Sequence, residues 1–409
     1  MNRLKIAHVT TVDYSLRDLL LNQLQSLQST GFEVVGISSS GTEVAAIEAA
    51  GIRHIAVSMS RRLTPLADMV STWKLCQVMR RERFCVVHTH TPKAGLLGQM
   101  AAKMAGGAIV INTVHGFYFH EHMTGRTRHF FIQVEKAGAF CSDLILSQNM
   151  EDIYTAVGEK ICTLPKIRYI GNGIDLRQFH PSAVTEKKTR DLRQQLNIPL
   201  ESPVIGFVGR LAARRKGFSD FLAAATILSE KFPTARFLIV GDPDIGKSDA
   251  VFPSAAEDYG IADQCVFTGL SPNADLPAIY SLMNVLVLPS LFEGVPRVVM
   301  EASAMGIPSV VSDVKGNREA VVHAKTGFIV PLGDVQAIVA AISQVISDEN
   351  LQQQLSKAGR IFASEHFDEQ MVFNRIRSEY AALLRAKRGI DILSLPNDPP
   401  ACSVAAAFQ

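Results

Sequence analysis

The sequence lacks the patterns that mark secreted and membrane-spanning proteins. Its six cysteines are scattered and form no CxxC pair, which argues against a zinc site and against a disulfide framework. No stretch of 18 residues is continuously apolar, and the apolar run near the first residue is too short for a signal peptide. We therefore expect a cytoplasmic protein without membrane-spanning segments.

Several nucleotide-binding patterns are also missing. No GxGxxG fingerprint follows the first expected strand of either half, which disfavours a nicotinamide enzyme, and there is no Walker A lysine motif. No basic run with interleaved aromatic residues occurs, so nucleic-acid binding is disfavoured. Residues 1–180 hold 19 Lys and Arg against 14 Asp and Glu, and the remainder holds 22 against 25. The first half is thus slightly better suited to an anionic surface.

What the sequence does contain is a repeated alternation of apolar strand-like and helical segments. A chain of 409 residues with 47% hydrophobic and 20% charged residues has ample core for two or three domains. The alternation is interrupted by the polar stretch 181–202 and then restarts. It predicts two α/β doubly wound domains, residues 1–180 and 200–367, each with a parallel sheet and helices on both faces. We expect strands at 5–12, 33–38, 53–58, 85–90, 109–114 and 143–147, and then at 204–208, 236–240, 265–268, 285–289, 309–312, 317–322 and 327–330.

The stretch Pro289–Asp313 places two glutamates where such sheets bind ligands. A buried strand is expected to end at Pro289, and a helix to begin at Pro296 and stop at Gly306. Glu293 would then lie at the carboxyl end of the strand, with Glu301 further along the helix. The alternative is two ordinary surface glutamates.

A cluster of cations follows the first strand of the second half. Arg210 comes at the end of that strand, and Lys216 stands six residues later, just before Gly217 and an expected helix. Two cations at a strand's carboxyl end, beside a helix N-terminus, suit a diphosphate. Because Arg214 and Arg215 are also present, a solvated turn is the alternative.

Together these motifs resemble the retaining glycosyltransferases of family 4, which have the GT-B fold of two Rossmann-like domains facing each other across a cleft. The resemblance covers nearly the whole chain. It is carried by GR with a lysine six residues later, by PS-xx-EG followed by EASAMGIP, by IGNGID at 170–175, by THTPKAG at 89–95 and by TVHGF at 113–117. The form EGVPRVVMEA, with THTPKAG and TVHGF, looks most like the branch that assembles capsule, O-antigen and other lipid-linked bacterial glycans.

The resemblance implies roles for particular residues of the second domain. Arg210 and Lys216 would bind the diphosphate of a nucleotide-sugar donor, which is expected to be a UDP-sugar. Glu301 would hold the ribose hydroxyls and Glu293 the hydroxyls of the donor sugar. Gly294, Val295 and Pro296 would also contact the donor, with backbone N–H groups from Gly294 and Val295. The nucleotide sugar is a co-substrate, and no further cofactor is implied.

The resemblance also implies a site in the first domain. His115 matches the family histidine that faces the reacting sugar; a structural histidine under a loop is the alternative. Many family members have a Gly-Gly loop after the first strand, where this chain has Thr10–Ser15. Ser15 or Arg17 would have to replace its contact with the donor phosphate. The last helical stretch, about 368–386, is expected to return to this domain, and 387–409 is expected to be disordered.

No metal site is expected. Asp242 and Asp244 flank Pro243 in an expected turn, and Arg210 with Lys216 already supplies positive charge for the departing diphosphate. The histidines His88, His90, His120 and His122 lack an acidic or cysteine partner in the sequence, so zinc is not expected. Retention of the anomeric configuration would proceed by front-face attack, with the departing phosphate taking the acceptor proton and His115 acting as a positioning and electrostatic residue.

The acceptor side is expected in the first domain. Aromatic residues 117–119, the mixed run 126–131 and the basic helix end 79–83 are candidates for a face that meets an anionic bilayer and a polyprenyl-diphosphate-linked acceptor. Alternatively the aromatics are core and the cations merely solvated. The resemblance thus implies an enzyme moving a sugar to a lipid-linked or polysaccharide acceptor. The other readings are a sugar-nucleotide 2-epimerase of the same fold, or a non-catalytic partner in a glycan assembly complex.

Overall fold

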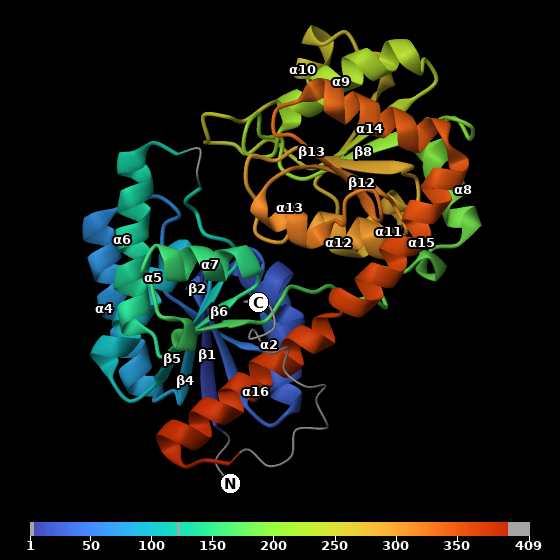
Figure 1. Ribbon diagram of the computed structural model, residues 1–409. Coiled ribbons are helices and arrows are strands. Elements are labelled where there is room, and N and C mark those ends of the chain that lie inside the picture. Colours follow the sequence, from blue (N-terminus) through green and yellow to red (C-terminus); the bar gives the residue numbers. More distant parts are fainter. Residues whose placement is uncertain (1–3, 121–122, 392–409) are drawn as a thin grey trace. The chain divides into compact units, whose positions relative to one another are not determined.

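The computed structural model describes residues 4–120 and 123–391 as two compact units, each built on its own parallel sheet (Figure 1). Unit 1 takes in the chain up to Gly171 and again from Gln370, and unit 2 runs from Asn172 to Glu369. The predicted α/β class with two doubly wound domains is confirmed. Most of the tail for which disorder is expected lies outside the described residues.

Unit 1 has a seven-stranded sheet in the order β3-β2-β1-β4-β5-β6-β7, with every neighbouring pair parallel. Its strands are β1 (Lys5–Val12), β2 (Glu33–Ser39), β3 (Arg53–Ala56), β4 (Val86–Thr89), β5 (Ile109–Val114), β6 (Leu144–Ser147) and β7 (Ile167–Tyr169). Its helices are α1 (Asp13–Ser15), the π-helical η1 (Leu16–Leu20), α2 (Leu21–Ser29), α3 (Val44–Ala49), α4 (Pro65–Glu82), α5 (Pro92–Ala105), α6 (Gly125–Cys141), α7 (Met150–Gly158), the 3₁₀ turn η2 (Leu164–Lys166) and α16 (Glu369–Arg388).

Helices cover both faces of this sheet because its strands are apolar on both sides. β4 and β5 are buried along their whole length, as expected of central parallel strands. On one face α2 and α16 form a core with Ile6, Ile111 and Leu146, to which α16 contributes Ile376 and Tyr380. On the other face α4 and α5 form a second core. The C-terminal helix therefore completes the core of unit 1.

Unit 2 has a six-stranded parallel sheet in the order β10-β9-β8-β11-β12-β13. Its strands are β8 (Val204–Val208), β9 (Arg236–Val240), β10 (Cys265–Gly269), β11 (Val285–Leu288), β12 (Ser309–Ser312) and β13 (Gly327–Val330). Its helices are η3 (Pro181–Ala183), α8 (Glu186–Gln195), α9 (Phe218–Lys231), α10 (Ala255–Asp258), η4 (Ala262–Gln264), η5 (Asn273–Asp275), α11 (Leu276–Tyr280), α12 (Arg297–Ala304), α13 (Lys315–Ala320), α14 (Val335–Ser347) and α15 (Glu349–His366).

Two local predictions differ from the structure. Residues 317–322, expected as a strand, belong mainly to α13, and the Asn317 side chain donates to the Ser312 carbonyl at the end of β12. Val321 and Val322 suggested a strand, but they come after the helix has ended. The polar stretch 181–202 contains α8 and lies inside unit 2, with Thr185 as its N-cap.

Each sheet reverses its winding at one point. In unit 1 the chain runs outward from β1 to β3 and then resumes on the other side of β1 with β4; in unit 2 the same happens between β8 and β11. The loops after these paired strands leave the same edge of the sheet in opposite directions. This edge is where open α/β sheets bind ligands.

Candidate active site

The donor-site residues predicted in unit 2 gather at its winding reversal. Arg210 and Lys216 lie in the loop between β8 and α9, and Glu293 lies in the loop between β11 and α12. Lys216 Nζ donates to Glu293 Oε1 at 2.6 Å, and Ser290 Oγ donates to the same oxygen at 2.7 Å. The side chain of Glu293 is almost wholly buried, whereas Lys216 is about one-third exposed. The structure therefore joins a cation and a carboxylate that stand 77 residues apart in the sequence.

Arg210 belongs to a neighbouring charge cluster that the sequence did not reveal. Its Nη1 donates to Asp244 Oδ1 at 2.8 Å, and Arg215 Nη2 donates to Asp244 Oδ2 at 2.7 Å. Arg215 also pairs with Asp249 at 2.8 Å. Burial alone would raise the pKa of Asp244, but the hydrogen bonds and charges of the two guanidinium groups outweigh it and lower that pKa below its ordinary value.

This cluster helps to decide between a binding role and a structural role for two motifs, the Asp-Pro-Asp turn at 242–244 and the cation run at 210–216. Both Asp244 oxygens accept from arginine, and Asp242 is exposed, so the Asp-Pro-Asp turn anchors the cation loop. Arg215 is held by two carboxylates, and Arg214 is exposed. The four-cation run is thus divided: one arginine is structural, one is solvated, and Arg210 and Lys216 remain as the candidate ligands of a diphosphate.

Two glycines allow the loops at this edge to approach closely. A Cβ on Gly217, whose φ is +66°, would lie 1.9 Å from the Pro289 carbonyl oxygen. A Cβ on Gly316, near the start of α13, would lie 1.1 Å from the Gly294 carbonyl oxygen. Both contacts are with backbone, which cannot swing aside as a side chain does. The predicted donor loop 294–296 is therefore packed directly against α13.

The NGID stretch that precedes unit 2's first helices also supports this loop. Asn172 Nδ2 donates to the Val295 carbonyl at 2.9 Å. Gly173 lies against the backbone of Glu369, where a Cβ would be 2.6 Å from its Cα. This gives the motif a structural role in holding Val295 and the loop that leads to Pro296, the N-cap of α12.

Glu301 lies apart from the Lys216–Glu293 pair, in a buried polar group on α12. Its carboxylate is 3% exposed, accepts from the Tyr280 hydroxyl at 2.9 Å, and lies 3.6 Å from Arg297 Nε. Burial raises the pKa of Glu301, although the charge of Arg297 and the Tyr280 hydroxyl oppose the rise. Arg297 stands four residues before Glu301, a helical spacing that could have revealed this pair. Its role towards a ribose stays a prediction.

His115 follows β5 in unit 1 and is half-buried. Its Nε2 lies 3.1 Å from His90 Nδ1, and its Nδ1 lies 3.0 Å from Gln148 Oε1. His88 and His90 are buried, and they group with His8, which lies opposite His88 in the β1–β4 register. His120 is half-buried after β5, and His122 lies outside the described residues.

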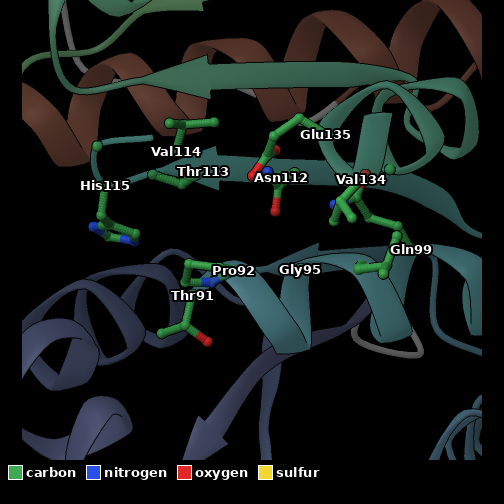
Figure 2. Close-up of a pocket in the computed structure, with 13 residues that line it drawn as sticks. Thr91, Pro92, Gly95, Gln99, Asn112, Thr113, Val114, His115, Val134 and Glu135 are labelled. Carbon is green, nitrogen blue, oxygen red and sulfur yellow. The ribbon is translucent and has the colours of Figure 1, made fainter. Parts of the chain in front are cut away.

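A shallow cavity of about 40 Å³ adjoins His115 (Figure 2). Its lining comes from α5, β5 and α6, and Figure 2 shows the Glu135 side chain beside Asn112. Burial, reinforced by the negative charge of Asp152, raises the pKa of Glu135 to about 7. Glu135 is thus a buried carboxyl group of unit 1 whose charge changes near neutral pH, and no sequence pattern singled it out.

The other first-domain candidates have structural partners. Ser15 is buried, and Arg17 is paired with Asp18 and Glu43 at the start of η1. Phe117 and Phe119 are core residues whose rings stack 5.0 Å apart, so they are not part of an exposed aromatic face. Tyr118 and Phe130 are exposed. The alternative that the aromatics belong to the core is therefore correct for two of these four.

Comparison with known proteins assigns a family to both halves. Residues 188–362 match the family described as "Glycosyl transferases group 1", and residues 19–173 match the "Glycosyl transferase 4-like domain". The chain is 28% identical over 355 residues (86% of this chain, 90% of the relative) to a "UDP-Gal:alpha-D-GlcNAc-diphosphoundecaprenol alpha-1,3-galactosyltransferase" of Escherichia coli. It is 28% identical over 397 residues (95% and 100%) to the "Capsular polysaccharide biosynthesis glycosyltransferase CapM" of Staphylococcus aureus.

Solved structures share the fold. The Anabaena protein HepE, in complex with UDP and glucose, superposes with a TM-score of 0.79 at 19% identity, covering 93% of this chain and 100% of that one. WaaG, a glycosyltransferase of lipopolysaccharide biosynthesis, gives a TM-score of 0.72 at 15% identity over 91% and 99%. A structure described as "putative UDP-N-acetylglucosamine 2-epimerase" from Listeria monocytogenes gives a TM-score of 0.67 at 13% identity, covering 97% of this chain and 100% of that one. The predicted GT-B fold is confirmed, and it is shared by the alternative enzyme class.

Proposed function

We propose that this chain, which belongs to the family 4 retaining glycosyltransferases, moves a hexosyl group from a UDP-sugar to a lipid-linked acceptor in bacterial surface-glycan synthesis. The observation that carries the proposal is the Lys216–Glu293 pair beside Arg210 at the winding reversal of unit 2. The activity named for the Escherichia coli relative supports the class of donor and acceptor, and the name of the Staphylococcus aureus relative supports a place in capsular polysaccharide biosynthesis. The proposed donor thus spans the cations and Glu293.

The paired charges suggest how the diphosphate is held. A lysine ammonium has three N–H donors, and only one is needed for Glu293 Oε1, so Lys216 can bind phosphate and carboxylate together. Glu293 fixes the position of that ammonium and accepts from sugar hydroxyls. As the bond between the anomeric carbon and the diphosphate breaks, negative charge grows on the diphosphate. Lys216 and Arg210, which are already in place, stabilise this charge.

The proposed reaction retains configuration by front-face displacement. The acceptor hydroxyl forms the new glycosidic bond on the face that the diphosphate leaves, and its proton passes to a departing phosphate oxygen. Glu301 is proposed to hold the ribose, and the backbone N–H groups near Gly294 and Val295 to contact the donor. His115 is proposed to act on the acceptor half of the reaction as a positioning and electrostatic residue.

The donor assignment is tested by UDP binding to four proteins. UDP should raise the melting temperature of the wild-type chain and of Arg214→Ala, since Arg214 is exposed and lies in the same loop. Lys216→Ala and Arg210→Ala should lose at least tenfold in UDP affinity by calorimetry. Equal affinity in all four proteins would refute the proposed diphosphate site.

We further propose that the helical face formed by α4, α5 and α6 docks on an anionic bilayer, which would supply the lipid-linked acceptor. These helices lie side by side on unit 1 (Figure 1). One stripe of α4 exposes large apolar side chains at helical spacing: Leu66 is 83% exposed, Met69 70% and Trp73 57%. An exposed apolar stripe of this kind marks an interaction site.

The charge of this face favours an anionic membrane as its partner. The three helices carry eight Lys and Arg against three Asp and Glu. Asp68 pairs with Lys93 at 2.6 Å, Glu82 with Lys5 and Arg53, and Glu135 faces the cavity. The exposed cations are thus left in excess, and each contributes about 1 kcal/mol near an anionic surface.

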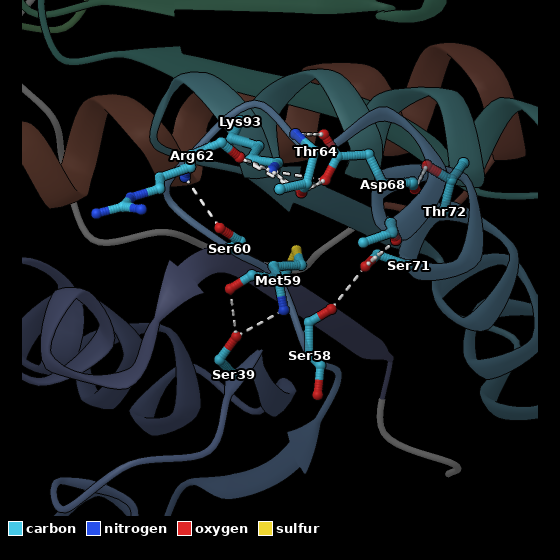
Figure 3. A network of polar contacts seen from close by, with 11 residues as sticks. Ser39, Ser58, Met59, Ser60, Arg62, Thr64, Asp68, Ser71, Thr72 and Lys93 are labelled. Carbon is cyan, nitrogen blue, oxygen red and sulfur yellow. Dashed lines mark hydrogen bonds and ion pairs between the residues drawn. The ribbon is translucent and has the colours of Figure 1, made fainter.

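The beginning of α4 is held firmly while its apolar side chains point outward. Ser71 Oγ donates to the Ser58 carbonyl at 2.6 Å, and Thr64 Oγ1 donates to Asp68 at 2.9 Å (Figure 3). Lys93 bridges Asp68 and Thr64, which ties the THTPKAG motif to this turn. The stripe is thus presented on a fixed support. No helix within residues 4–120 and 123–391 is apolar and long enough to span a membrane.

Vesicle flotation tests the docking face. The wild-type chain should float with vesicles containing phosphatidylglycerol and remain at the bottom with neutral phosphatidylcholine vesicles. The double variant Met69→Gln/Trp73→Gln should lose most of its flotation, about tenfold. Leu270→Gln, which alters an 80% exposed leucine of unit 2, is the control and should float normally. Equal recovery with both kinds of vesicle would contradict the proposal.

A further inference from the structure

Inward from His115, unit 1 contains a continuous hydrogen-bonded chain of aromatic side chains. His115 Nε2 lies 3.1 Å from His90 Nδ1, and His90 Nε2 lies 3.0 Å from His8 Nδ1. The Tyr380 hydroxyl lies 3.4 Å from His8 Nε2 and 2.7 Å from His88 Nδ1. This hydrogen-bonded chain links His115, the candidate site histidine, to Tyr380 in α16.

The hydrogen-bonded chain ends at both sides on a polar group that does not ionise near neutral pH. His115 Nδ1 lies 3.0 Å from Gln148 Oε1, and His88 Nε2 lies 2.7 Å from Thr113 Oγ1. An amide and an aliphatic hydroxyl do not supply or remove a proton under these conditions. A net proton therefore does not pass out through these ends, and the chain is suited to holding its protons in place.

The inner rings are buried and neutral. His8, His88 and His90 are at most 1% exposed. Burial lowers the pKa of His8 to about 3, and burial together with the neighbouring histidines lowers the pKa values of His88 and His90 well below the ordinary value. A neutral imidazole has one N–H donor and one acceptor nitrogen. Each inner ring must therefore donate on one side and accept on the other.

This requirement gives the whole chain a single direction. With Gln148 Oε1 as the acceptor, His115 carries its hydrogen on Nδ1, and its Nε2 accepts from His90 Nδ1–H. By the same rule His90 Nε2 accepts from His8 Nδ1–H, and His8 Nε2 accepts from the Tyr380 hydroxyl. The Tyr380 oxygen then accepts from His88 Nδ1–H.

The last link closes the chain, because Thr113 Oγ1–H donates to His88 Nε2. All four histidines therefore carry the hydrogen on the same ring atom, Nδ1. Changing the tautomer of one ring would leave two donors or two acceptors facing each other in a buried place, which is strongly unfavourable.

We infer that His8, His88, His90 and Tyr380 are positioning residues that hold His115 in one orientation and one tautomer. In that tautomer both ring nitrogens of His115 are engaged, so the ring offers neither a free proton nor a free lone pair to an acceptor. His115 then acts as a fixed dipole, in agreement with a mechanism in which the departing phosphate takes the proton. The catalytic meaning of this inference rests on the proposed function; the tautomer does not.

The same rings could be read as metal ligands, since nitrogen atoms of His8, His88 and His90 lie within 4.8 Å of one another. The contacts favour the hydrogen-bonded chain. Both His88 nitrogens face hydroxyl groups, and His8 Nδ1 lies at hydrogen-bond distance from His90 Nε2. Metal analysis of the purified chain separates the two: a bound transition metal at one equivalent would overturn the inference.

Nitrogen NMR of the ¹⁵N-histidine-labelled full chain tests the tautomers directly. Long-range proton–nitrogen correlations distinguish a protonated Nδ1 from a protonated Nε2 in each ring, and single substitutions assign the signals. We expect His8, His88, His90 and His115 all to be neutral and protonated on Nδ1. A mixture of tautomers among the four, or rapid exchange in His115, would overturn the inference whether or not the protein transfers a sugar.

Two variants of His90 test the consequence for catalysis. His90→Leu removes the donor to His115 Nε2 and should lower kcat at least tenfold while leaving KM for the UDP-sugar unchanged. His90→Asn keeps an N–H near the position of Nδ1 and should restore most of the rate together with the His115 signals. Unchanged kcat and unchanged His115 signals in folded His90→Leu would refute the positioning role. Absence of transfer by the wild-type chain would instead count against the proposed function.

Discussion

At the scale of single residues, the candidate site is made of charges that already have partners. Lys216 is paired with Glu293, and Arg210 with Asp244, so neither carboxylate nor cation is isolated in a partly buried place. The partners fix the positions of the cations before a ligand arrives. A donor diphosphate would therefore share these cations with carboxylates, and it would find them without reorganisation.

Glu135 is a residue whose effect on stability should depend on pH. Its pKa of about 7 lies above the ordinary value of 4.5, because burial and Asp152 disfavour the carboxylate. The folded protein therefore keeps this proton to higher pH than the unfolded chain does. The stability that this provides is present below about pH 4.5 and is lost as the pH rises through about 7.

Glu135→Gln removes this titration. The melting temperature of the variant, relative to the wild type, should therefore rise between pH 5 and pH 8, as measured by differential scanning calorimetry. Glu365→Gln, at an exposed glutamate of α15, is the matched control and should show no such trend. If the difference in melting temperature between Glu135→Gln and the wild type were the same at both pH values, the raised pKa of Glu135 would be contradicted.

At the scale of secondary-structure elements, the site depends on how closely α13 approaches the loop after β11. Gly316→Ala would place a Cβ 1.1 Å from the Gly294 carbonyl oxygen, so the loop or the helix must move. We expect a loss of about 3 kcal/mol in the free energy of unfolding, at the upper end of overpacking costs. UDP affinity should fall as well, because the displaced loop carries the proposed donor contacts.

Denaturant unfolding of the full chain and UDP calorimetry measure these two effects. Gly158→Ala is the control, since a Cβ there meets nothing within 4 Å, and it should leave both quantities nearly unchanged. If Gly316→Ala were as stable as Gly158→Ala and bound UDP equally well, the close approach of α13 to the Gly294 carbonyl would matter neither for stability nor for UDP binding.

Much of the fold could be predicted from the sequence because its strands are short apolar runs separated by amphipathic helices. The apolar run 285–289 and the Pro-Arg start of α12 placed Glu293 correctly after a strand. The helix α6 was missed because its residues mix aromatics and cations without a clear period. The long-range partners Asp244, Tyr280 and His8 could not be predicted, since they depend on strand order and register that a single sequence does not show.

At the scale of the whole molecule, each unit carries a different part of the proposed reaction. Unit 2 holds the cations and glutamates of the donor site, and unit 1 holds His115 with its histidine chain and the α4–α5–α6 face. α16 gives unit 1 part of its core, and its Tyr380 is one link of the histidine chain. Unit 1 therefore needs this C-terminal helix in addition to its N-terminal segments. The two family matches, residues 19–173 and 188–362, follow the two units along the chain.

The central claim, sugar transfer from a UDP-sugar at the Lys216–Glu293 site, is tested most directly by UDP release with analysis of the product. The full chain is incubated with a panel of UDP-sugars and with an undecaprenyl-diphosphate-linked sugar in anionic vesicles. We predict UDP release only when donor and acceptor are both present, a product that keeps the anomeric configuration of the donor, and at least a 100-fold loss of rate in Lys216→Ala and Glu293→Ala. An inverted product, epimerised UDP-sugar formed without acceptor, or near-normal rates in both variants would contradict the account.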